Sequence, residues 1–227
     1  MDKKSNLIVW FLMLLIFPMA SYAQKDVTQF LDIPVDGYKP EMIEKLKSKG
    51  YTINQQSEDV LDGEFNGTKV NIVIGTNNNK VWRIAILDEY TTDETNIKIR
   101  FNNLIQQFVN NNRYSTQSDS IISKFIIPED ERISYEMTVN KKRYEAVFYQ
   151  KALKYDSLIN ETALLVAKDT LNDEENDRVY ALLEETMKVS MDELNKRVWF
   201  MIKEDYGEYR IVIFYENVYN EASGNEL

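Results

Sequence analysis

The stretch VLDGEFNGTKVNIVIGTNNNKVWRIAILDEY, residues 60–90, decides the fold of this chain. Its dipeptide Asn66-Gly67 is a strong signal for a tight turn between antiparallel strands, and the asparagines at 77–79 supply a second turn. Between the turns, residues 68–76 alternate between apolar and more polar side chains, as a strand with one buried face does. Residues 80–90 are apolar on both faces, which is typical of a central strand. The stretch therefore predicts three successive antiparallel strands, the third lying inside a larger sheet.

Two predicted helices flank these strands. Lys39-Pro40-Glu41 places proline where the first helical turn tolerates it, and Gly50 is suited to end that helix. Asp93 can cap a second helix, on which the apolar residues recur with the helical period: Ile97, Phe101, Leu104, Ile105 and Phe108. This stripe predicts a helix packed against the sheet.

The second half of the chain repeats the pattern of hairpins. ISYEMTVNKKRYEAVFYQ, residues 133–150, alternates as a hairpin does, and residues 198–218 predict another that turns at Tyr206-Gly207. Between them, residues 156–196 are predicted to form an acidic helical insert. Its main apolar stripe is predicted to contain Val179, Leu182, Leu183, Thr186 and Met187.

These elements predict an α+β fold: a mostly antiparallel sheet built from hairpins, with helices packed on one face. Residues 24–227 are expected to form a single domain. Residues 81–90 and 198–206 both pair Val-Trp with an apolar strand and an acidic tail that ends in tyrosine. This likeness leaves open a division into two related halves, about 29–113 and 121–227.

The first residues have the features of a secretory signal peptide. Lys3 and Lys4 precede an apolar run at 7–19, which is shorter than the roughly 20 residues that span a bilayer. Small residues follow, and Ala23 stands where signal peptidase would cut. We therefore expect residues 1–23 to be removed before Gln24, with no stable membrane insertion afterwards; a retained anchor is the alternative.

Composition excludes several classes of function. The chain contains no histidine and no cysteine, which removes His- and Cys-based catalysis and the usual zinc, haem and iron–sulfur sites. No cofactor or metal is expected. The net charge of −10 becomes −11 once residues 1–23 are removed, because Asp2, Lys3 and Lys4 leave with them. Such a balance argues against binding to nucleic acid.

Several segments resemble a family of small exported proteins from Bacteroidales-type bacteria: IPVDG (33–37), EMIEKLKSKGY (41–51), GEFNGTKVNIVI (63–74) and the tail that begins at Tyr206. The resemblance covers most of the chain outside the insert, and Asp32 stands where family members commonly have glycine. It implies an exported protein, periplasmic or extracellular, of a Gram-negative bacterium, with an α+β fold. The expected arrangement of helices and strands is also loosely similar to that of β-lactamase inhibitor protein-like modules. The family brings no catalytic motif.

The chemistry that remains favours binding over catalysis. Tyr135, Tyr149 and Tyr209 are placed on predicted hairpin strands, where their rings can contact a protein or glycan. The leading hypothesis is an exported, non-enzymatic binding module that uses the open face of its sheet. The alternatives are core packing of these rings, a glycoside hydrolase that uses two carboxylates, and a structural protein that maintains the cell envelope.

Overall fold

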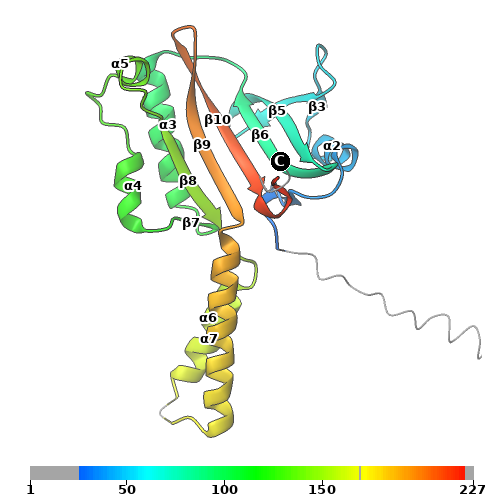
Figure 1. The fold of residues 1–227 in the computed structure, drawn as a ribbon, viewed down its shortest axis with the longest axis vertical. Coiled ribbons are helices and arrows are strands. Elements are labelled where there is room, and N and C mark those ends of the chain that lie inside the picture. Colours follow the sequence, from blue (N-terminus) through cyan, green and yellow to red (C-terminus); the bar gives the residue numbers. More distant parts are fainter. Residues whose placement is uncertain (1–25, 169, 223–227) are drawn as a thin grey trace, which may run out of the picture.

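The computed structural model describes residues 26–168 and 170–222, so the signal segment and its cleavage site at Ala23 and Gln24 lie outside the described residues. An antiparallel eight-stranded sheet runs through the molecule in the order β3-β4-β5-β6-β10-β9-β8-β7 (Figure 1). Its strands are β3 (Thr52–Ile53), β4 (Val60–Phe65), β5 (Thr68–Asn77), β6 (Lys80–Asp88), β7 (Tyr114–Ser115), β8 (Glu145–Gln150), β9 (Lys196–Asp205) and β10 (Glu208–Asn217). A separate two-stranded sheet pairs β1 (Gln29–Phe30) with β2 (Ile33–Pro34). The predicted α+β class is confirmed.

The predicted turns account for the sheet's connections. The two central residues of each turn have positive φ: 52° and 71° at Asn66-Gly67, 48° and 62° at Asn78-Asn79, and 53° and 86° at Tyr206-Gly207. This backbone conformation matches the right-handed twist of the strands that it joins, and it favours asparagine and glycine. β6, predicted to be central, pairs with β5 on one side and with β10 on the other.

Four helices cover one face of the sheet: α2 (Lys39–Ser48), α3 (Glu94–Val109), α4 (Asp119–Phe125) and α5 (Ile133–Thr138) (Figure 1). The stripe predicted on α3 is buried at all five positions, and the Asp93 side chain accepts a hydrogen bond from the Asn96 amide at the start of the helix. α2 buries Met42 and Leu46 in the same core. The chain ends in a short 3-10 helix, η1 (Val218–Asn220).

The helical insert is a hairpin of α6 (Tyr155–Val166) and α7 (Asp173–Glu193) that projects away from the sheet, beyond the adjoining ends of β8 and β9 (Figure 1). The stripe predicted on α7 is not one surface: Leu182 is buried, whereas Leu183 and Met187 are exposed. Within the described residues, no helix has both the length and the apolar character that a membrane span requires.

The predicted strand at 133–139 is wrong. These residues form α5, and β8 pairs on that edge with the short strand β7 instead. Ile133 and Met137 are four residues apart, which places them on the same side of a helix as well as of a strand. The Glu94 side chain accepts a hydrogen bond from the Ile133 amide at 2.6 Å, and so satisfies a free donor at the start of α5.

The sheet consists of two four-stranded halves that meet where β6 pairs with β10. Val81-Trp82 lies in β6, at this junction, whereas Val198-Trp199 lies in β9, one strand away from it. Exchanging the halves would relate β6 to β10, so the shared dipeptide occupies strands that are not equivalent. The division into related halves stays a prediction.

Candidate functional site

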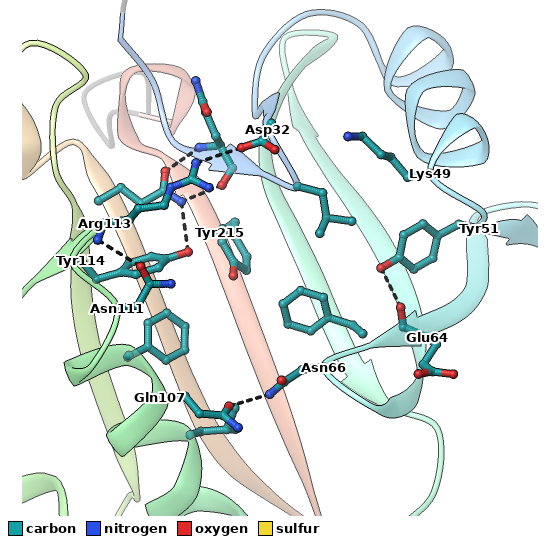
Figure 2. Close-up of a pocket in the computed structure, with 16 residues that line it drawn as sticks. Asp32, Lys49, Tyr51, Glu64, Asn66, Gln107, Asn111, Arg113, Tyr114 and Tyr215 are labelled. Carbon is teal, nitrogen blue, oxygen red and sulfur yellow. Dashed lines mark hydrogen bonds and ion pairs between the residues drawn. The ribbon is translucent and has the colours of Figure 1, made fainter.

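A cleft of about 740 Å³ lies on the helix-covered face of the sheet. α2 covers one half of that face and α3 the other (Figure 1). The cleft opens between them (Figure 2). Lys49 and Tyr51, just after α2, stand on one side of it, and Gln107 and Asn111, from the end of α3, stand on the other (Figure 2). Its volume falls within the range typical of small-ligand sites.

Aromatic rings form the floor of the cleft. The rings of Phe65, Phe108, Tyr114 and Tyr215 line it. The Phe30 ring is fully buried and does not line the cleft, but its centroid lies 5.0 Å from that of Tyr215 and 5.3 Å from that of Phe65. Burial raises the pKa of Tyr215 well above its ordinary value, so its hydroxyl stays neutral. Tyr51 donates a hydrogen bond from its hydroxyl to the Glu64 carbonyl at 3.1 Å. Its ring lies so close to Gly63 that a Cβ there would come within 2.3 Å of it.

Polar contacts close the cleft at both ends (Figure 2). At one end, Asn66 Nδ2 in the β4–β5 turn donates to Gln107 Oε1 at 2.6 Å. At the other, Arg113 Nη2 donates to Asp32 Oδ1 at 3.0 Å. Both contacts join segments that are far apart in the sequence, and so they link the two walls of the cleft.

Asp32 reaches the cleft from a tight turn. Leu31 and Asp32 join β1 to β2 with φ values of 51° and 63°, a conformation that favours glycine. Aspartate tolerates it better than most other residues. Here the side chain gains an ion pair with Arg113 that glycine could not make.

Acidic and basic side chains line the cleft in equal numbers. Asp32 and Glu64 are acidic, and Lys49 and Arg113 are basic. Burial raises the pKa of a different carboxyl, that of Glu193 at the base of α7, which accepts a hydrogen bond from the Ala152 amide at 2.8 Å. Across residues 26–168 and 170–222, no cluster of three or more acidic side chains is arranged to hold a metal ion.

The three tyrosines nominated from the sequence do not share a surface. Tyr209 is 3% exposed and lies in the core, on the helix-covered face of β10. Tyr135 is exposed, but on α5 rather than on a strand. Tyr149 is half-buried on β8 and lies opposite Arg197 on the other face of the sheet. Core packing, the alternative for these rings, holds for Tyr209.

The face of the sheet that α2–α5 do not cover also carries aromatic rings, which were not predicted from the sequence to be a binding surface. Trp199 and Phe214 are cross-strand neighbours whose rings stack at 4.2 Å. The Arg83 guanidinium lies 4.0 Å from the Trp82 ring and 4.8 Å from that of Phe214. The sequence of residues 196–217 already indicated this second apolar face, because large apolar side chains alternate onto both faces of β9 and β10.

Comparison of the chain with protein-family models, with curated proteins and with solved structures finds no match.

Proposed function

We propose that this chain is an exported, non-enzymatic binding protein that holds a neutral oligosaccharide in the cleft between α2 and α3. The observation that carries the proposal is the composition of the cleft, whose floor is aromatic and whose walls present amide side chains with no net charge. Rings offer a flat apolar surface to the carbon-bound face of a sugar. Amides both donate and accept hydrogen bonds, as sugar hydroxyls require.

The positions of the rings and amides fit this role. Phe65 is only partly buried and lies at the same end of the cleft as the Asn66–Gln107 hydrogen bond. A sugar ring above Phe65 would have the two amides beside its hydroxyls. A small number of polar groups around an apolar floor is the usual arrangement of ligand sites.

Substitutions on the two faces of the sheet test the proposal. A panel of neutral oligosaccharides on a glycan array would supply the ligand, and calorimetry its affinity. We expect Gln107→Ala to remove about 1 kcal/mol of binding, roughly a fivefold rise in Kd. Phe65→Leu keeps apolar volume against Phe30 and removes the ring, with an expected loss of similar size.

Tyr149→Ala is the matched control, because Tyr149 lies on the opposite face of the sheet. We expect it to leave the affinity unchanged. Weaker binding with Tyr149→Ala, together with normal binding by the two cleft variants, would contradict the cleft and favour the open sheet face.

A protein partner on that open face is the second candidate, and the stacked Trp199–Phe214 pair is the observation that favours it.

A glycoside hydrolase needs a carboxylic acid that stays protonated beside a second carboxylate. Burial raises the pKa of the Glu193 carboxyl, but Glu193 does not line this cleft. Release of reducing sugar during long incubation with an oligosaccharide that binds on the array would contradict binding without hydrolysis.

If no glycan or protein binds, a structural role in maintaining the cell envelope is the remaining hypothesis. The envelope integrity of a deletion strain tests it.

Export gives a separate prediction. We expect the protein purified from its host's envelope or medium to begin at Gln24, because Ser21 and Ala23 are small residues suited to signal peptidase. Amino-terminal sequencing checks this. Met1 at the start of the abundant folded protein would contradict export by cleavage.

A further inference from the structure

α7 and its C-terminal cap, Leu194, carry a stripe of exposed apolar side chains. The stripe lies on the side of the helix opposite to Arg178 and Glu185, which form ion pairs with Glu161 of α6 and with Lys154 at its start. Its members are 46–71% exposed: Tyr180, Leu183, Met187, Met191 and Leu194. At about 100° per residue, all five fall within an arc of about 80°. Leu182, which is buried, lies on another side of the helix. Isolated apolar residues are common on protein surfaces, but a continuous stripe on a projecting helix marks an interaction surface.

The spacing of this stripe is symmetric about Met187. Leu183 and Met191 lie four residues to either side of it, and Tyr180 and Leu194 lie seven residues to either side. In an antiparallel pair of α7 helices related by a two-fold axis at Met187, Tyr180 faces Leu194, Leu183 faces Met191 and Met187 faces its own copy. Every exposed apolar residue then meets another one, which is what a two-fold interface requires.

The charges beside the stripe fit the same pairing. Glu184 and Lys188 are both exposed and follow one edge of the stripe. An antiparallel two-fold pair brings this edge against the same edge of the partner. Lys188 of each copy then lies within about one turn of Glu184 in the other. This contact is made twice, and it outnumbers the one Lys188–Lys188 contact at the axis. A parallel pair would instead place this edge against Thr186 and Ser190, which carry no charge.

The area is sufficient for a stable dimer. If a fully exposed large side chain presents about 200 Å², the exposed fractions of the stripe correspond to roughly 600 Å² on each copy. Complete burial of these side chains in the pair would remove about 1,200 Å² from water, which reaches the lower limit of specific interfaces. The stripe is also open along its whole length, since Leu194 beside the sheet is still 52% exposed.

We propose that two copies of this chain associate through antiparallel packing of their α7 helices, with the two-fold axis at Met187. Each copy's α6 then lies on the outside of a four-helix layer. No residue of the stripe lines the cleft, so the proposal does not depend on the proposed function.

Sedimentation of the purified protein over a range of concentrations tests the association. We expect a concentration-dependent dimer, and we expect Met187→Asp to raise the dimer dissociation constant at least 100-fold, because it opposes two like charges at the axis. Leu164→Asp is the matched control: Leu164 is 74% exposed on α6, away from the stripe, and the dimer should persist. A monomer at every concentration of the unchanged protein would overturn the proposal.

The register has its own tests. Because the chain has no cysteine, Met187→Cys should give a disulfide-linked dimer under mild oxidation, whereas Tyr180→Cys should not, since Tyr180 faces Leu194. Glu184→Lys and Lys188→Glu should each weaken the dimer, and the double variant should restore it. Efficient cross-linking at Tyr180→Cys but not at Met187→Cys would contradict the antiparallel arrangement.

Discussion

Phe101→Ala is expected to lower the free energy of unfolding by about 3 to 5 kcal/mol. Phe101 lies in the middle of the buried stripe of α3 and is fully buried. Its ring centroid is 5.1 Å from that of Phe200 on β9, and the two rings meet edge to face. Alanine would remove the ring from the contact that joins α3 to the sheet, and it would leave a cavity that a packed core fills only in part.

Urea denaturation measures this change, provided that its slope is the same for both proteins. Ile99→Ala is the control, since Ile99 belongs to the same helix and is 54% exposed. It should cost less than about 0.5 kcal/mol. A loss below about 1 kcal/mol for Phe101→Ala would mean that α3 does not pack on the sheet as described.

The elements that were predicted correctly depend on signals carried by neighbouring residues. The turn at Asn66-Gly67 needs two residues with positive φ, and asparagine and glycine are the side chains that adopt it most easily. The stripe on α3 has a period that only a helix can bury on one side. These features could be predicted because the local sequence and the tertiary fold require the same conformation.

The elements that were predicted wrongly are those for which the local pattern fits two structures. Alternation at 133–139 fits a strand, but Ile133 and Met137 are also one helical turn apart, and the cap from Glu94 lies far away in the sequence. On α7, Leu182 and Leu183 are adjacent in sequence but about 100° apart around the helix, and Leu182 is buried whereas Leu183 is exposed. A single sequence does not show where one apolar stripe ends and a second begins.

The cleft could not have been predicted. Asp32, Tyr51, Asn66, Gln107 and Arg113 come from five separate segments, and the fold alone brings them together. The prediction that Tyr209 belongs to a binding face was wrong for a related reason. Both faces of β10 carry aromatic and aliphatic side chains, so the alternation separates the faces without indicating which one the helices cover.

Glu216→Ala is expected to destabilise the protein by about 2 to 4 kcal/mol. Glu216 is fully buried on the open face of the sheet, where its carboxylate accepts hydrogen bonds from Arg83 and Arg197 on the neighbouring strands. Breaking a buried ion pair costs about 3 to 5 kcal/mol, because the remaining charge stays out of water. We expect somewhat less here, since the two arginine side chains are 28% and 33% exposed and can regain part of their hydration.

The matched control is Glu145→Ala, which removes a strand glutamate that is 42% exposed and paired with Arg143. Exposed pairs contribute about 0 to 1 kcal/mol, so urea denaturation should separate the two variants clearly. Equal losses would mean that the buried ion pairs of Glu216 contribute no more to stability than an exposed pair does.

Replacing Arg83, Glu216 and Arg197 together by apolar residues shows how much of the loss of stability is due to charge and how much to packing. The triple variant Arg83→Met, Glu216→Leu, Arg197→Met leaves no unpaired charge in the buried cluster; Glu221 loses its ion pair with Arg197, but its side chain is 37% exposed. Methionine at position 83 can still pack on the Trp82 and Phe214 rings. We expect it to recover most of the stability that Glu216→Ala loses, because apolar groups of similar volume avoid the cost of desolvating ions. A triple variant as unstable as Glu216→Ala would instead show that the hydrogen bonds of this cluster stabilise the junction of β6, β10 and β9 beyond their desolvation cost.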